Sequence, residues 1–168
     1  MRADYGNLDV LINNAGTVVE GDMAAPASVP TQALRDTYDI NVFGVHEVTR
    51  AFWPLLELSE AARLVSVSSA GGSLAMHSDF EGPMKDYKFI AYASSKAALN
   101  MMMIHYAWQW RNTPHKANAI HPGNVKTDLN QGGDIDVVEG AKTSVEMATI
   151  GSDGPNGTFS HLGQTLPW

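Results

Sequence analysis

The stretch Leu8-Asp9-Val10-Leu11-Ile12-Asn13-Asn14-Ala15-Gly16 begins apolar and ends in polar and small residues. Its apolar run, residues 10–12, predicts a short buried strand, and the Asn-Asn-Ala-Gly that follows predicts a turn. Strands with two buried faces belong to parallel sheets that are covered by helices. The stretch therefore indicates an α/β protein and suggests that further strands of this kind follow.

Two similar strands are expected farther along the chain. Residues 64–68 run into the turn Ser69-Ala70-Gly71-Gly72, and residues 117–120 stop at His121-Pro122-Gly123. A last short strand is expected at 158–159. In parallel sheets, ligands bind beyond the carboxyl ends of the strands. The polar turns after the first three strands should therefore meet at one rim and form a candidate site.

Helices are expected between these strands, because apolar residues recur there at helical spacing. The predicted helices cover residues 31–38, 41–58, 91 or 92 to 111, and, with a weaker pattern, 137–150. Residues 17–30 read as a loop and residues 73–90 as irregular. Pro54 should kink its helix or lie near its end. Alternating strands and helices give an α/β fold with a parallel sheet.

Composition narrows the function classes. The chain has 168 residues, 44% of them hydrophobic, a net charge of −7 and no Cys. One domain with a real core fits this length, and a disulfide framework, a thiolate zinc site and a Cys nucleophile are excluded. The acidic balance argues against nucleic acid and anionic membrane as partners. We expect a cytoplasmic protein without a membrane span, and no metal site, because the six His are scattered.

Tyr92 and Lys96 are four residues apart on a predicted helix, so they share a face. A phenol has a pKa of about 10 and is a poor proton carrier at neutral pH. A neighbouring ammonium favours the phenolate, and bringing the pKa near 7 requires roughly 4 kcal/mol. Such a Tyr could protonate a carbonyl or deprotonate an alcohol. An isolated Tyr-x-x-x-Lys is more often a surface pair, so the spacing alone leaves both readings open.

Other polar residues of the predicted rim have a functional and a structural reading. Ser69 could hold a substrate oxygen, or it could satisfy backbone groups of the turn; Ser66 and Ser68 compete with it. Asn41 could hold a water behind Lys96, or it could cap or break a helix. A Ser-His-Asp hydrolase is disfavoured, because no Gly-x-Ser-x-Gly elbow surrounds Ser69.

The segment after the third strand could meet a ligand through its backbone. Gly123 allows close approach of a ligand, and the Val125 amide and the Thr127 hydroxyl could bind a carboxamide. Taken alone, Pro122-Gly123 indicates only a turn.

In order along the chain, these motifs resemble the short-chain dehydrogenase/reductase family, and in particular its carbonyl-reductase-like members. The resemblance rests on residues 8–16, Asn41-Val42-Phe43-Gly44, residues 65–69, Tyr92-Ala93-Ser94-Ser95-Lys96, residues 121–127 and the tail from Gly154 to Phe159. It implies a partial Rossmann-like, doubly wound parallel sheet that consists of the C-terminal strands and helices only.

The resemblance also implies NAD(P)-dependent interconversion of a ketone or aldehyde and an alcohol. Tyr92 would be the general acid/base, Lys96 would lower its pKa and hold the cofactor ribose, Ser69 would orient the substrate oxygen, and Asn41 would complete a proton relay. The residues implied to line the cofactor are Asn13, Ala15, Gly16, Tyr92, Lys96, Pro122, Gly123, Val125 and Thr127. NADP is slightly preferred over NAD, the substrate is a small molecule, and the resemblance is compatible with a homo-oligomer.

Two departures from the family pattern shape the expectations. Ser69 and Tyr92 are 23 residues apart, which implies an insertion of roughly ten residues within 73–90, a lid or a cover for a helix surface. The sequence also lacks the first strand and the Thr-Gly-x-x-x-Gly-x-Gly turn, so residues 1–168 are expected to form one incomplete domain with residues 10–12 at an exposed edge. A non-catalytic remnant that acts as an interaction module is the alternative hypothesis.

Overall fold

The computed structural model describes residues 6–21 and 25–168 and shows one five-stranded sheet with helices on both faces. The strands are β1 (Val10–Asn13), β2 (Arg63–Val67), β3 (Lys116–Ile120), β4 (Phe159–His161) and β5 (Gln164–Thr165). They lie in the order β1-β2-β3-β4-β5. The pairs from β1 to β4 are parallel, and β5 is antiparallel to β4. The α/β architecture is confirmed.

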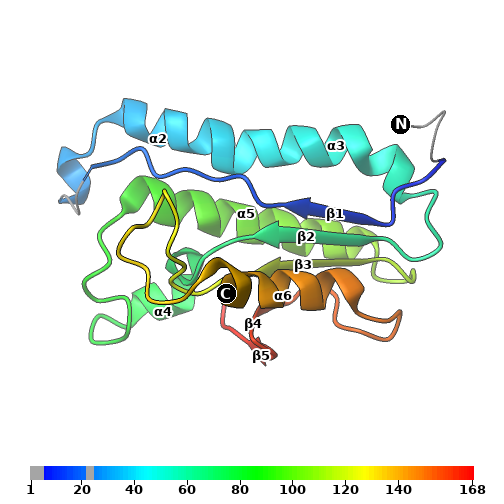
Figure 1. The fold of residues 1–168 in the computed structure, drawn as a ribbon. Coiled ribbons are helices and arrows are strands. Elements are labelled where there is room, and N and C mark those ends of the chain that lie inside the picture. Colours follow the sequence, from blue (N-terminus) through cyan, green and yellow to red (C-terminus); the bar gives the residue numbers. More distant parts are fainter. Residues whose placement is uncertain (1–5, 22–24) are drawn as a thin grey trace.

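The helices lie close to the predicted ranges. They are α2 (Thr31–Tyr38), α3 (Val45–Leu56), α4 (Leu74–Ser78), α5 (Ile90–Gln109) and α6 (Val137–Thr149), with a π-helical turn, η2 (Asp39–Gly44), between α2 and α3 and short 3-10 turns η1 (Pro26–Ser28) and η3 (Ala70–Gly72). Pro54 lies near the end of α3, as expected. In Figure 1, α5 passes behind the strands and α6 passes in front of them. None of the described helices is long and apolar enough to span a membrane.

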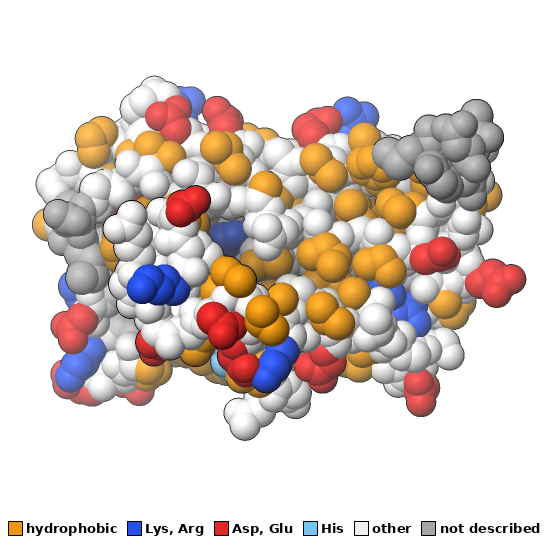
Figure 2. Space-filling view, viewed as in Figure 1, with side chains coloured by type: hydrophobic (Ala, Val, Ile, Leu, Met, Phe, Trp, Pro, Cys, Tyr) orange, Lys and Arg blue, Asp and Glu red, His pale blue; other side chains and the backbone are white. Residues whose placement is uncertain are grey.

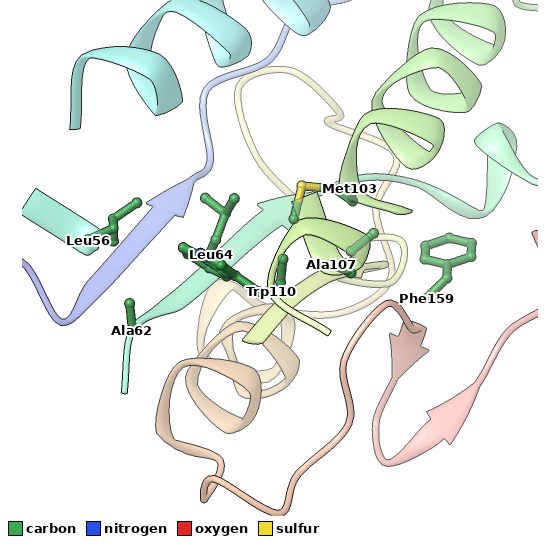
Figure 3. Packing of buried hydrophobic residues seen from close by; sticks show 9 residues of the cluster. Leu56, Ala62, Leu64, Met103, Ala107, Trp110 and Phe159 are labelled. Atoms are coloured by element: carbon green, nitrogen blue, oxygen red, sulfur yellow. The ribbon is translucent and has the colours of Figure 1, made fainter. Parts of the chain in front are cut away.

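The core has one layer on each side of the sheet. Neighbouring residues of a strand point to opposite faces, so Leu64 joins a cluster with Met103 and Trp110 of the α5 side, whereas Val65 packs with Ile120 and Met147 on the α6 side. Figure 3 shows the first cluster converging between the strands and the end of α5. Both faces of β2 are thereby removed from water.

Two parts of the structure correct the sequence-based expectations. Residues 73–90 were expected to be irregular, but α4 forms there, with Ser73 Oγ accepting the Met76 N–H at 3.1 Å as its cap. The strand β5 was not expected. It follows a two-residue turn at Leu162 and Gly163, which both have positive φ (44° and 74°). Such turns usually carry Asn or Gly at both positions, and Leu162 hides the signal.

The strand β1 lies at an exposed edge. Within the described residues it pairs with β2 alone, and Val10 and Ile12 are 37% and 40% exposed. The buried strand predicted at residues 10–12 is therefore half open to solvent. Val137, Val138 and Val145 of α6 are also exposed. Figure 2 shows apolar side chains gathered over the middle of this face.

Candidate active site

The turns after β1, β2 and β3 open at the same rim of the sheet. The register pairs Asn13 with Ser66, and Val67 with Ile120, so the three strands end nearly level with one another. The next residues along the chain are the Asn14-Ala15-Gly16 turn, Ser68-Ser69 and His121-Pro122-Gly123. The convergence predicted from strand direction is present in the structure.

The side chains of Tyr92 and Lys96 lie on the same face of α5, at the start of that helix. The Lys96 Nζ atom lies 5.6 Å from the centre of the Tyr92 ring. Lys96 is buried, and its ammonium donates a hydrogen bond to the Val67 carbonyl at 2.9 Å. The helix and the end of β2 together fix the ammonium beside the phenol.

Ser69 is the serine of this region that faces the rim. Ser66 and Ser68 are both buried, Ser66 within β2 and Ser68 with its hydroxyl donating to Asn100 Oδ1 at 2.6 Å. Ser69 is half-buried at the start of η3, and its Oγ accepts the Gly71 N–H at 3.1 Å. The structural reading of Ser69 as a turn residue is correct, and its position still leaves it beside Tyr92.

Burial controls the protonation of this pair. It raises the pKa of Tyr92, and the Ser69 hydroxyl lowers that pKa to a smaller extent. Burial also lowers the pKa of Lys96 to about 8. Burial therefore dominates the Tyr92 pKa here, and the lowering of that pKa by Lys96 stays a prediction. At neutral pH, Tyr92 is a neutral phenol and therefore a proton donor.

Asn41 lies in the π-helical turn η2 and is fully buried. Its Oδ1 accepts the Thr17 N–H at 2.8 Å, and its Nδ2 donates to the Thr17 carbonyl at 2.9 Å and to Ser95 Oγ at 3.0 Å. Wide turns of this kind often occur at functional sites. Asn41 joins the loop after β1 to α5 from within a helical turn that runs directly from α2 into α3, and its role in a relay stays a prediction.

The turn after β1 gives a ligand close access to Lys96. A side chain on Gly16 would come within 3.3 Å of Lys96 Nζ and 3.5 Å of Asn41 Oδ1, and Gly16 and Ala15 are exposed. The buried Asn13 side chain donates to Thr49 Oγ1 at 2.9 Å and to Ser66 Oγ at 3.4 Å, and its role in lining the cofactor stays a prediction. These bonds link the end of β1 to α3 and β2.

The Pro122–Thr127 segment forms the other side of the rim. Gly123 has a φ of +91°, and a side chain there would meet Ile135 Cδ1 at 2.6 Å, so the turn requires glycine. Val125 bridges to Ile135, and Thr127 Oγ1 accepts the Asn130 N–H at 3.2 Å. Pro122 precedes this turn and is half-buried. The segment is a folded wall of the rim.

Two residues at this site escaped the sequence analysis. Tyr87 comes from the inserted segment, and its ring lies where a side chain on Gly71 would be, 2.7 Å from Tyr87 Cε1. Burial and then Tyr92 raise the pKa of Tyr87, while the Ser69 hydroxyl lowers it. Tyr87 also lines a cavity of about 270 Å³. Glu20 contacts the start of α5 through its carboxylate. Neither residue belongs to a motif, and no local pattern marked them.

The described residues contain no group of three His, Cys, Asp or Glu side chains that could hold a metal ion. The polar side chains that meet at the rim are the phenol of Tyr92, the ammonium of Lys96 and the hydroxyl of Ser69. These groups can move a proton to or from an oxygen atom of a bound molecule.

Comparisons with known proteins agree with this geometry. A family model described as short chain dehydrogenase matches residues 1–136. The C-signal protein of Myxococcus xanthus is 34% identical over 168 residues, which cover 97% of this chain and 94% of that protein. The short-chain dehydrogenase/reductase eupG of a Phoma species is 31% identical over 77% of this chain, and this chain spans only 51% of its length.

Among solved structures, a short-chain dehydrogenase/reductase from Burkholderia multivorans with bound NADP superposes with a TM-score of 0.82 and 25% identity. The match covers 99% of this chain and 69% of that structure. The family model covers most of the chain, and the fold matches as well. The chain therefore belongs to the short-chain dehydrogenase family.

Proposed function

We propose that this chain carries the proton-transfer site of an NAD(P)-dependent oxidoreductase that interconverts a ketone or aldehyde and an alcohol. The observation that carries the proposal is the buried Lys96 ammonium fixed 5.6 Å from the Tyr92 ring, with Ser69 beside it at the carboxyl ends of the strands. Family membership and the NADP in the Burkholderia multivorans structure support it. Its substrate is a small molecule, its setting is cytoplasmic, and NADP is slightly preferred.

The residues of the rim fit the nicotinamide end of such a cofactor. Gly16 lies beside Lys96 Nζ, and the Pro122–Thr127 segment forms the opposite wall of the rim. Lys96 would hold the ribose, and the Val125 amide and Thr127 would meet the carboxamide. The sequence has no Thr-Gly-x-x-x-Gly-x-Gly turn for the pyrophosphate. We infer that residues 1–168 form the C-terminal part of one doubly wound domain.

The side chains would share the reaction as follows. The bound cofactor supplies or takes a hydride. Tyr92 gives its proton to the carbonyl oxygen during reduction, or takes the proton of the alcohol during oxidation. Ser69 holds that oxygen and stabilises its charge. The ammonium of Lys96 favours the phenolate that forms on Tyr92, and Asn41 keeps the neighbouring loop and Ser95 in register.

Titration of the purified chain with NADPH and with NADH tests this proposal, with the fluorescence of the four Trp as the signal. Saturable binding in the micromolar range supports it, and comparing the two cofactors settles the NADP preference. Turnover of simple ketones, and its loss in Tyr92→Phe, then tests the assigned chemistry. Absence of binding up to millimolar cofactor, in a chain shown to be folded by circular dichroism, would contradict it.

One observation favours a second candidate, a non-catalytic interaction module. The C-signal protein, whose name describes a signal, matches this chain over nearly the full length of both. Among residues 6–21 and 25–168, β1 has no neighbour on its outer side, and such an edge can pair with another chain. A folded chain that binds neither cofactor but self-associates or binds a partner through β1 would support this second candidate.

A further inference from the structure

Glu20 is a buried carboxylate at the start of the helix that carries Tyr92. It lies four residues after Gly16 and is 9% exposed. Its Oε1 accepts the Tyr92 N–H at 2.6 Å, and its Oε2 accepts the Ala91 N–H at 3.1 Å. Both carboxylate oxygens are thus used by α5, and one of them is bonded to the backbone of the proposed proton donor.

The first N–H groups of a helix have no partner within the helix. In α5 the N-cap residue, Phe89, offers no side-chain acceptor. A carboxylate at this end is favoured by the helix dipole and by charge-assisted hydrogen bonds. Glu20 supplies it from a distant part of the chain, so the direction and position of the first turn of α5 depend on the loop after β1.

The same loop is attached to α5 at a second point. Asn41 holds both the N–H and the carbonyl of Thr17, and it donates to Ser95 Oγ at 3.0 Å. The Ser95 hydroxyl in turn donates to the Tyr92 carbonyl at 2.7 Å. Residues 17–20 are therefore fastened to the helix on both sides of Tyr92, directly after the turn that opens toward Lys96.

We propose that Glu20 is a positioning residue that links the cofactor-side loop to the first turn of α5 and so fixes Tyr92 relative to a cofactor bound at Gly16. This inference rests on the function proposed above for Tyr92. Glu20 belongs to none of the motifs, and it would join the loop after β1, on the cofactor side, to the helix that carries Tyr92. A displacement of about 1 Å at a reacting group can cost a hundredfold in rate, so such a link matters for turnover as well as for folding.

If Glu20 were only a helix cap, its removal would weaken the first turn of α5 without moving the Tyr92 side chain. The chain contains a matched control for this distinction. Asp136 caps α6 through its side chain, which accepts the Glu139 N–H at 2.8 Å. Asp136→Ala removes a capping carboxylate from a helix that does not carry Tyr92, and Glu20→Ala removes one from the helix that does. Glu20→Gln keeps the size of the side chain and one acceptor oxygen, and it serves if the alanine variant does not fold.

Amide hydrogen exchange of the free chain is the first measurement. In Glu20→Ala, the Ala91 and Tyr92 amides should exchange at least about tenfold faster, because each loses a hydrogen bond to a charged acceptor. In Asp136→Ala, the Glu139 amide should respond and the two α5 amides should not. Unchanged exchange at Ala91 and Tyr92 in Glu20→Ala overturns the proposal.

The second measurement separates positioning from capping. In a chain labelled with ¹³C at the tyrosine ring, the Tyr92 resonance should move in Glu20→Ala and in Glu20→Gln and should stay in place in Asp136→Ala. At temperatures below the unfolding transition, Glu20→Ala should raise the KM for cofactor and lower kcat, each about tenfold. The KM and kcat of Asp136→Ala should stay within twofold of those of the original chain. If the Tyr92 resonance does not move in the Glu20 variants, Glu20 is only a helix cap and the positioning role is wrong.

These outcomes remain distinct from those of the proposed function. If the original chain neither binds cofactor nor turns over a ketone, the proposed function fails, while exchange and the Tyr92 resonance still decide whether Glu20 sets the first turn of α5. If the chain is active and Glu20→Ala is equally active per folded molecule, the proposed function stands and the positioning role is wrong.

Discussion

The Nζ atom of Lys96 donates a hydrogen bond to the backbone carbonyl of Val67, 2.9 Å away, at the carboxyl end of β2. This bond ties α5 to β2 and holds a cation in a buried site. Burial there lowers the pKa of Lys96 to about 8, so the ammonium persists at neutral pH and loses its proton in mildly alkaline solution.

The first prediction concerns stability above pH 8. Lys96 titrates at about 8 in the folded chain and near 10.5 when unfolded, so the unfolded state binds more protons in this window. The contribution of Lys96 to the free energy of unfolding should therefore rise from pH 8 to pH 10.5. Urea unfolding of the original chain and of Lys96→Met should give a difference that grows with pH. Parallel profiles would show that Lys96 is not the group responsible.

Tyr92→Phe should lower kcat at least about a hundredfold, because it removes the proton donor and leaves the ring in place. Cofactor affinity should change little, since the Lys96 ammonium remains. The measurement is steady-state reduction of a ketone next to a fluorescence titration. Tyr106→Phe, which removes a phenol bonded to His46 at 2.8 Å, is the control and should keep its activity. Equal losses in both variants would argue against the assignment.

Gly72→Ala should push α5 away from the end of β2. A side chain at this position would come within 2.7 Å of the Lys96 carbonyl carbon and 3.0 Å of the Ala97 nitrogen, which are backbone atoms and cannot move alone. Overpacking of this kind costs about 1–3 kcal/mol. Thermal unfolding should show the loss, and turnover should fall with it. Gly132→Ala, which meets nothing closer than 3.8 Å, should behave like the original chain.

Acidification should destabilise the chain through His121. Burial, and to a smaller degree His161, lowers the pKa of His121 to about 4, and its Nδ1 has no hydrogen-bond partner among the described residues. Between pH 6.5 and 4 the unfolded state binds more protons than the folded state. The free energy of unfolding should therefore decrease as the pH is lowered through this range, by at most about 3 kcal/mol. His121→Phe should fall less steeply in urea titrations, whereas a variant of the exposed His105 should follow the original chain.

Arg63→Met should destabilise the fold by about 3 kcal/mol, because removing one side of a buried polar network leaves the other side without partners. The Arg63 guanidinium is buried and donates to the carbonyls of Ile150, Ala61, Ala62 and Pro114 at 2.7–3.1 Å. Arg50→Met removes an exposed arginine paired with Glu47 and should leave the free energy of unfolding nearly unchanged. Similar losses from both changes in chemical unfolding would be inconsistent with this account.

Much of the architecture could be predicted because it depends on local pattern. The predicted helix at residues 31–38 has the bounds of α2. The strand predicted at 64–68 is shifted by one residue from β2, and the strand predicted at 117–120 begins one residue after the start of β3. Hydrophobic periodicity is set by which face of an element is buried, and the sequence records it directly. The antiparallel β5 could not be predicted, since Leu162 occupies a left-handed turn position.

The site could be predicted only in part, and the reason differs from residue to residue. The spacing of Tyr92 and Lys96 is a helical repeat, so their shared face follows from sequence alone. The choice of Ser69 over Ser66 and Ser68 needed the pleat of β2 and the packing around it. Asn13 was expected to line the cofactor, and its side chain proved to bond inward to Thr49 and Ser66.

The sequence by itself determined the family, the order of the strands and helices, and the residue types at the rim. Each of these follows from motifs and hydrophobic periodicity, which are patterns among residues close together in the chain. The tertiary structure alone decided the protonation of Tyr92 and Lys96, since burial by distant segments sets both pKa values. It also brought Glu20 to the start of α5 and Tyr87 to Ser69 and Gly71. Contacts between residues far apart in the chain arise from packing of the whole domain, and no local pattern records them.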